Sequence, residues 1–165
     1  MTTIHISDRS WDHPDGIMLR QAQRSEISVR YNSNADSDPE AGPAPTEADI
    51  IVFLVAYMDG CPVACGALRE LNIDPHTGSP PAGDGEVKRM FVLPQFRGRK
   101  FGIATAVLRA LEERARSRGW SKLVLETGTL LTDAIRFYTR EGYTPIQNYG
   151  HYAGSEISVC LERKL

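Results

Sequence analysis

The feature that most constrains this chain is a basic, glycine-containing turn between an expected strand and an expected helix. Residues 97–104 read Arg-Gly-Arg-Lys-Phe-Gly-Ile-Ala. Residues 86–92 before it favour a strand, and the apolar spacing of residues 103–117 after it favours an amphipathic helix. The first amides of a helix lack intrahelical partners, and with the helix dipole they attract anions. Because arginine and lysine add charge and donors there, the turn predicts a phosphate-binding site.

The turn lacks both common nucleotide-binding patterns, G-x-x-x-x-G-K-[ST] and G-x-G-x-x-G. It resembles instead the acyl-CoA-binding segment of the GCN5-related N-acetyltransferases, the GNAT family, which carries [Q/R]-x-x-G-x-[G/A]. Two registers fit. Residues 99–104 match the pattern fully, whereas an ungapped count from residues 92–94 begins it at Arg97 and places Lys100 where the first glycine is expected. In either register the resemblance implies that the amides of residues 98–104 face the pyrophosphate of acetyl-CoA, the expected co-substrate.

A second motif supports the same resemblance. Residues 134–143, Ala-Ile-Arg-Phe-Tyr-Thr-Arg-Glu-Gly-Tyr, are similar to the family pattern A-[IV]-x-[FL]-Y-x-x-x-G-[FY]. The likeness is strongest over residues 86–143, about a third of the chain. It implies an α/β (α+β) fold with a mixed, mostly antiparallel central sheet flanked by helices on both faces. The length suits one acetyltransferase domain over residues 1–165.

Hydrophobic periodicity and turn residues give an order of elements that agrees with that fold. Thr132 or Asp133 is expected to cap the last helix. Residues 32–47 and 72–85 are rich in Pro, Gly, Asp and Ser and predict irregular loops. The expected strands cover residues 2–7, 50–57, 63–71, 86–93, 122–127, 143–147 and 156–162, and the expected helices cover residues 16–31, 103–117 and 134–140.

Composition excludes several other classes of protein. Three cysteines and four scattered histidines lack the spacing of a metal site, so no metal is expected. A net charge of −2 argues against a nucleic-acid partner, and no apolar run is long enough to cross a membrane. Residues 1–8 do not resemble a secretory signal, so the cytoplasm is the default compartment. Many GNAT proteins pair, so a homodimer is among the assemblies that the resemblance implies.

Acetyl transfer from a thioester to an amine needs a group that protonates the departing thiolate, and Tyr138 is the candidate. A phenol has an ordinary pKa near 10, so at neutral pH it holds a proton that it can donate as the thiolate departs. The resemblance implies that this tyrosine lies beside the sulfur of acetyl-CoA. Without the family motif, an aromatic residue of the core would be the simpler interpretation.

The amine must also lose a proton before it attacks, and Glu86 is the first candidate for the base. It stands six residues before Val92, where many family members carry a glutamate that takes the proton, often through water. A solvated carboxylate at the start of a strand is the alternative interpretation. Glu126 on the expected next strand is the alternate base, and His151 and Tyr149 are weaker candidates.

The resemblance assigns the remaining contacts to the co-substrate. The strand carrying Met90, Phe91 and Val92 is expected to splay from its neighbour, and a bulge there would free main-chain groups for the pantetheine and the thioester oxygen. Leu131 stands where many relatives carry an asparagine that contacts the coenzyme, so that contact is expected to be lost, or to be supplied by Thr132 or another residue. The phosphate-binding set is Arg97, Gly98, Arg99, Lys100, Phe101, Gly102, Ile103 and Ala104.

The expected activity is transfer of the acetyl group of acetyl-CoA directly to a primary amine of a small molecule or a protein. A covalent acyl-enzyme is not expected, because no cysteine or serine has a recognisable base beside it. Residues 1–85 carry 5 Lys/Arg and 13 Asp/Glu, which mildly favours a cationic acceptor. Two alternatives remain: a non-catalytic acyl-CoA sensor on the same fold, and a nucleotide-phosphate-binding module of another fold.

Overall fold

The computed structural model describes residues 2–32, 45–71, 73–78 and 83–165. Predictions that fall on residues 33–44, 72 and 79–82 lie outside the described residues. Two short 3-10 helices, Pro94–Phe96 and Gly150–Tyr152, accompany the regular elements. Those elements are β1 (Ile4–Asp8), α1 (Pro14–Arg30), β2 (Ile50–Met58), β3 (Cys61–Glu70), β4 (Gly85–Val92), α2 (Ile103–Ser117), β5 (Lys122–Gly128), α3 (Thr132–Arg140), β6 (Thr144–Ile146) and β7 (Ser158–Lys164).

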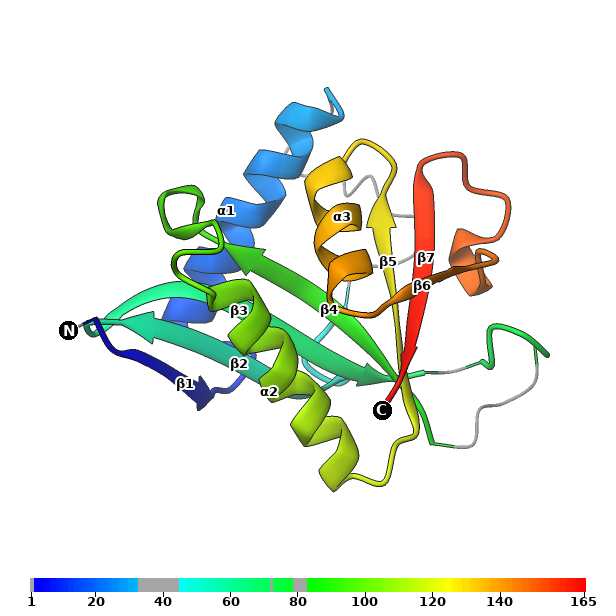
Figure 1. The fold of residues 1–165 in the computed structure, drawn as a ribbon, viewed down its shortest axis with the longest axis horizontal. Coiled ribbons are helices and arrows are strands. Elements are labelled where there is room, and N and C mark those ends of the chain that lie inside the picture. The colour runs from blue at the N-terminus through cyan, green and yellow to red at the C-terminus, as the bar shows by residue number, and fades with distance from the viewer. Residues whose placement is uncertain (1, 33–44, 72, 79–82) are drawn as a thin grey trace.

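The strands form one sheet in the order β1-β2-β3-β4-β5-β7-β6. All neighbouring pairs are antiparallel except β4 and β5, which are parallel. Leu19 of α1 packs in the core on one face, whereas Val107 of α2 and Tyr138 of α3 pack in the core on the other (Figure 1). The predicted fold class, a mostly antiparallel mixed sheet with helices on both faces, is therefore confirmed.

The central strands β4 and β5 separate after a short stretch of pairing. Only Gly85–Val87 pair with β5, although β5 itself continues to Gly128 against β7. On its other side β4 is bulged, because Cys65 pairs with Phe91 while Ala67 pairs with Lys88. Arg89, inside the bulge, has a φ of +55°. The expected splay and bulge are thus present, and they free main-chain groups on the inner edge of β4.

The starts of two helices agree with the sequence, and the cap of the third does not. The bounds of α2 agree with the expected residues 103–117. Helix α1 begins at Pro14, within the helix-start residues 12–15 that precede the expected apolar spacing, and His13 caps it by accepting a hydrogen bond from the Asp15 amide. The prediction that Thr132 or Asp133 caps α3 is wrong: Leu131 is the N-cap and makes no side-chain cap bond. Asp133 instead pairs with Arg30 on α1, a long-range contact that competes with local capping.

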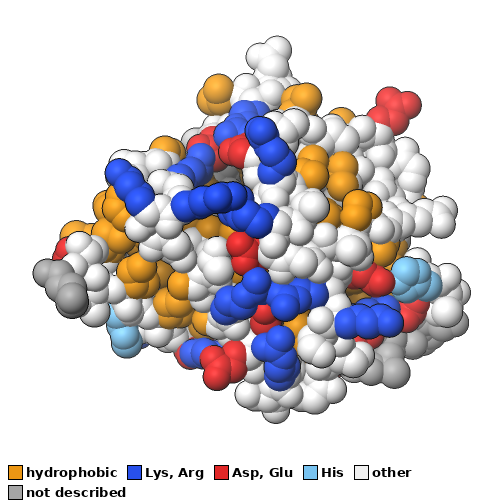
Figure 2. Space-filling view, viewed as in Figure 1, with side chains coloured by type: hydrophobic (Ala, Val, Ile, Leu, Met, Phe, Trp, Pro, Cys, Tyr) orange, Lys and Arg blue, Asp and Glu red, His pale blue; other side chains and the backbone are white. Residues whose placement is uncertain are grey.

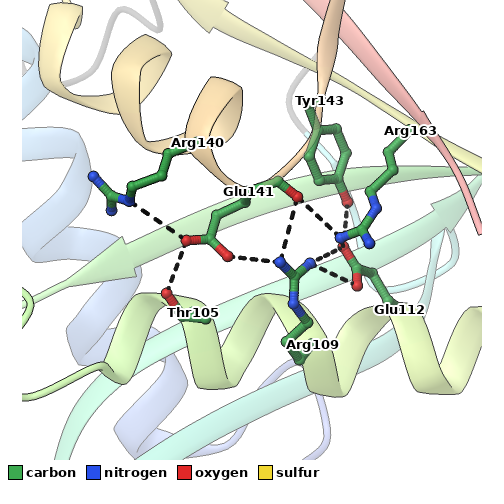
Figure 3. A network of polar contacts seen from close by, with 7 residues as sticks. All are labelled: Thr105, Arg109, Glu112, Arg140, Glu141, Tyr143 and Arg163. Carbon is green, nitrogen blue, oxygen red and sulfur yellow. Dashed lines mark hydrogen bonds and ion pairs between the residues drawn. The ribbon is translucent and has the colours of Figure 1, made fainter.

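A buried ionic network ties α2, α3 and β7 together (Figure 3). Glu112 of α2 is fully buried and accepts hydrogen bonds from Arg109, Arg163 and the Tyr143 hydroxyl. Arg109 also donates to the Glu141 carboxylate, 2.7 Å away at the end of α3. Because a buried carboxylate must be paired to be tolerated, this network fixes the C-terminal end of α3 against α2. It thereby sets the position of the helix that carries the candidate acid.

Candidate active site

A cleft of about 490 Å³ follows the splay between β4 and β5. Its walls come from α1, the bulged end of β4, the turn that opens α2, and α3. Nine of the expected co-substrate contacts line it: Met90, Phe91, Val92, Arg97, Gly98, Arg99, Gly102, Ile103 and Ala104. The sequence pattern therefore locates one wall of the cleft well.

The turn at the start of α2 presents main-chain donors to this cleft. Gly98 and Gly102 have φ values of +108° and +65°, a conformation that favours glycine, and Gly102 is the residue before the helix. Partners are found for the amides of Phe101 and Gly102. Within the part of the chain that the structure describes, no bond engages the amides of residues 98–100 and 103–105. Their arrangement fits an anionic group.

Four arginines from three elements line the same cleft: Arg30, Arg97, Arg99 and Arg140. Figure 2 shows Lys and Arg side chains gathered on this face, over the opening between the β4–α2 turn and α3. Arg97 already donates to the Val92 carbonyl at 2.8 Å and to Glu26 at 2.9 Å. The exposed Arg99 is therefore better placed than Arg97 to meet a phosphate.

Three other expected contacts do not line the cleft. The exposed Lys100 lies over the Phe101 ring, and Phe101 packs against Phe96 and the core. Thr132 is exposed in the first turn of α3, while its neighbour Leu131 lines the cleft. Both sequence registers of the glycine motif therefore fall on one turn, but the two residues in the middle of that turn, Lys100 and Phe101, do not line the cleft.

A second, smaller cavity of about 100 Å³ adjoins the cleft. The two hollows share lining residues from α1, the bulge, the β5–α3 loop and α3: Gln23, Ile27, Met90, Leu131, Ala134 and Tyr138. Two reactants placed one in each hollow would thus meet at these side chains. Tyr138 is the only one of the six with an acidic proton.

Tyr138 is held in an apolar setting. Its side chain is buried, and its ring contacts those of Phe137 and Tyr143. Burial, and secondarily the negative charge of Glu126, raises the pKa of Tyr138 above its ordinary value. Burial disfavours the phenolate, so the hydroxyl keeps its proton at neutral pH. A protonated hydroxyl is therefore available as an acid or hydrogen-bond donor at the junction of the two hollows.

The structure separates the two candidate bases. Glu126, on β5, lines the smaller cavity and lies close enough to influence Tyr138 electrostatically. Glu86 lines neither hollow and is almost fully buried, where its carboxylate accepts hydrogen bonds from Arg69 and Tyr149. The geometry thus brings Glu126, and not Glu86, together with Tyr138. His151 lies exposed in the 3-10 helix Gly150–Tyr152.

Gln23 is a site residue that sequence reasoning did not single out. Its Nε2 donates to the Met90 carbonyl at 2.9 Å, inside the bulge. Its Oε1 is buried and, among the described residues, has no hydrogen-bond partner. Gln23 lines both hollows, and a buried acceptor atom that lacks a partner favours binding of a ligand that donates an N–H. In the sequence, the only sign of this role is that Gln23 lies on the inward face of the helix expected over residues 16–31.

The residues present fit an acyl-CoA. The unpaired amides and Arg99 suit the phosphates at one end of the cleft, and the unpartnered Gln23 Oε1 and the buried Tyr138 suit an amide and a sulfur at the other. Among the described residues no cluster of three or more His, Cys, Asp or Glu side chains is arranged to hold a metal ion. No described helix is both long and apolar enough to cross a membrane.

Comparison with known proteins gives a consistent result. A family model described as "Acetyltransferase (GNAT) family" matches residues 18–143. The IAA acetyltransferase of Azospirillum brasilense is 38% identical over 115 residues, which cover 70% of this chain and 69% of that protein. The aminoalkylphosphonate N-acetyltransferase of Salmonella typhimurium is 44% identical over 59 residues, 36% of this chain and 37% of that protein.

Solved structures share the fold over nearly the whole chain. A Klebsiella pneumoniae protein assigned as an acyl-CoA N-acyltransferase has a TM-score of 0.74 and 27% identity, and the match covers 99% of this chain and 98% of that one. A GNAT family acetyltransferase from Elizabethkingia anophelis, solved with acetyl-CoA bound, has a TM-score of 0.63 and 17% identity, with 98% of each chain covered.

Proposed function

Because this chain belongs to the GNAT family of acetyltransferases, we propose that it transfers the acetyl group of acetyl-CoA directly to a primary amine. One observation carries the proposal: Tyr138 lies where a phosphate-compatible cleft and a second cavity meet. A thioester seated in the cleft and an amine seated in the cavity would be adjacent there. The relatives named as N-acetyltransferases support an amine as the acceptor.

The proposed roles follow from the position of each group. The amides of residues 98–100 and 103–105, with Arg99, hold the diphosphate. Glu126 accepts the proton that the ammonium group must lose before it attacks, directly or through a water molecule. Tyr138 donates its proton to the departing thiolate. Free main-chain groups of the bulge in β4 hold the thioester oxygen as it gains negative charge.

The position of Glu86 suggests a supporting role instead of a chemical one. Its buried carboxylate is held by Arg69 of β3 and by Tyr149, so it joins three segments of the chain behind the site. An acceptor for protons from a substrate must be reachable by that substrate. We therefore propose Glu126 as the base. Glu86 instead holds β4 in place through its hydrogen bonds to Arg69 and Tyr149.

A non-catalytic acyl-CoA sensor would need the cleft but neither Tyr138 nor Glu126. The relatives named as acetyltransferases do not favour that alternative. The nucleotide-binding module of another fold is excluded by the observed sheet and its structural neighbours. The acceptor cavity of about 100 Å³ favours a small molecule, or a single side chain or terminus of a larger one.

The test is titration of the protein with acetyl-CoA, followed by an amine panel in which released CoA is detected with a thiol reagent. Cys61 is exposed and would react with that reagent, so a Cys61→Ser variant is the proper assay protein. Saturable binding and amine-dependent CoA release would support the proposal. Saturable binding without release across the panel would favour the sensor, and absence of binding would exclude both.

A further inference from the structure

The smaller cavity is bounded in part by a contact between the end of α1 and the end of β5. Tyr31 directly follows α1, and Gly128 is the last residue of β5. Both line the smaller cavity, and neither is among the described residues that line the larger cleft. A change at either residue should therefore affect the occupant of the cavity while leaving the ligand of the cleft untouched.

Tyr31 is held at its backbone and at its hydroxyl. Its amide donates to the Ile27 carbonyl at 3.0 Å, so its backbone continues the last turn of α1. Its hydroxyl accepts a hydrogen bond from the Leu130 amide, 3.2 Å away in the loop between β5 and α3. The phenol ring therefore spans from the end of α1 to the β5–α3 loop, two segments that lie side by side in Figure 1.

The close approach of this ring accounts for the glycine at position 128. A Cβ on Gly128 would overlap the hydroxyl oxygen and the ring of Tyr31. Backbone conformation does not require glycine there, since Gly128 is not among the glycines with a positive φ. Gly128 pairs with Ser158 of β7, and the Thr129 amide donates to the Ile157 carbonyl at 3.0 Å. Because β5 is held on that side, an added side chain would displace the phenol and not the strand.

The cavity bounded by this contact is too small for an aromatic ring. A cavity of about 150 Å³ holds one benzene molecule. The smaller cavity has about 100 Å³, which suits an amine on a short chain of a few heavy atoms. Removal of the Tyr31 phenol would open additional space of the size and shape of one aromatic ring next to that volume.

We propose that Tyr31 sets the upper size limit for the acceptor: with Gly128 it restricts the cavity to compact primary amines and excludes amines that carry an aromatic ring close to the nitrogen. This inference rests on the proposed function and specifies the acceptor class of that same site. Tyr31 takes no part in the chemistry, which is assigned to Tyr138 and Glu126. It determines specificity through the bulk of its ring.

The test compares kcat/KM for pairs of primary amines that differ by one aromatic ring, such as ethylamine with 2-phenylethylamine and alaninamide with phenylalaninamide. Values are expressed per concentration of unprotonated amine, since the ring also changes the basicity of the amine. The ratio within a pair does not depend on the fraction of active protein, so a general loss of folding leaves it unchanged. The parent protein should prefer the amine without the ring by about tenfold or more.

Tyr31→Ala is the informative variant. Its preference for the compact amine should disappear or reverse, a change of about tenfold or more in the ratio, because the vacated space accommodates the aromatic ring of the substrate. Tyr31→Phe is the matched control: it keeps the ring and loses only the hydroxyl, so the preference should be retained. Acetyl-CoA affinity, measured by titration, should be unchanged in both variants, because Tyr31 does not line the larger cleft.

Gly128→Ala tests the same contact from the other side. Its methyl group would displace the phenol of Tyr31 and should lower the preference for the compact amine. In the background of Tyr31→Ala the same methyl group meets no phenol, so the ratio should stay that of Tyr31→Ala alone. Non-additive effects of this kind are expected when two residues are in direct contact.

Outcomes for the inference and for the proposed function are distinguishable. Equal efficiency of the two amines of each pair in the parent protein would overturn the inference and leave the acetyltransferase intact. So would a preference that survives in Tyr31→Ala, equal effects of Gly128→Ala in both backgrounds, or a Tyr31→Phe protein that behaves like Tyr31→Ala. Acetyl-CoA binding without turnover of any amine would overturn the proposed function, and the size limit with it.

Discussion

The Nε2 of Gln23 lies 2.9 Å from the carbonyl oxygen of Met90, so a side chain of α1 occupies a main-chain acceptor of the bulge in β4. The same amide leaves its Oε1 buried without a partner among the described residues. The Nε2 of Gln23 therefore supports the bulge, and its Oε1 can accept a hydrogen bond from a ligand. This contact joins the helix that covers one face to the strand whose Met90 lines both hollows.

Replacing Gln23 with leucine should lower kcat/KM about tenfold, because it removes both the support of the bulge and an acceptor for a ligand N–H. Thermal unfolding should change little, since the substitution also removes the buried Oε1, which has no partner among the residues that the structure describes. Gln21→Leu, an exposed position on the same helix, is the control. Equal kinetics of the two variants would show that Gln23 does not touch the reaction.

Tyr138→Phe should reduce kcat by about a hundredfold or more while leaving acetyl-CoA affinity nearly unchanged, as expected for loss of a general acid. Calorimetric titration and steady-state rates measure the two effects separately. Tyr143→Phe is the matched control, because its hydroxyl bonds Glu112 in the buried network. That variant should lose about 1–3 kcal/mol of stability with little loss of kcat.

Glu126→Gln should lower kcat, whereas Glu86→Gln should lower the free energy of unfolding. Glu86 is buried and paired with Arg69, so removal of its charge should cost about 3 kcal/mol in the free energy of unfolding. Denaturant titration of both variants, alongside their rates, separates the roles. A Glu86→Gln protein that unfolds like the parent but is catalytically impaired would move the base back to Glu86.

The sequence located the turn of the co-substrate cleft better than the acceptor side, and the reason is physical. Helix α2 and its glycine turn are local, so periodicity and backbone preference predict them. Glu86 meets Tyr149, 63 residues away, and Asp133 meets Arg30, 103 residues away. Such pairings depend on how the sheet closes, and no local pattern encodes them. The presence of Arg89 in the lining of the smaller cavity depends likewise on a bulge in β4 that is visible only in three dimensions.

The rate should not fall on the alkaline side before about pH 10. Tyr138 acts in its protonated form, and burial raises its pKa above the ordinary value near 10, so the acid is retained as pH rises. The neutral fraction of the amine grows over the same range, so kcat/KM should rise from pH 7 to pH 9. A pH–rate profile with a decline near pH 8.5 that disappears in Tyr138→Phe would contradict this assignment.

Arg99→Gln should weaken acetyl-CoA binding about tenfold, because it removes a charge-assisted contact to phosphate. Lys100→Gln is the matched control, since the neighbouring Lys100 does not line the cleft. Titrations at two salt concentrations measure the difference, and the contribution of Arg99 should shrink as salt rises. If Lys100→Gln proves the more damaging change, the turn must rearrange when the coenzyme binds.

The left-handed backbone of Arg89 implies a trade-off between stability and the charge that Arg89 brings to the smaller cavity. An L-residue in that conformation costs about 1–2 kcal/mol that glycine avoids. A population of variants screened for heat resistance alone is therefore expected to accumulate glycine at this position. Those variants would be more stable but would lack one of the charged side chains that line the smaller cavity, as happens when strain at a functional residue is relieved.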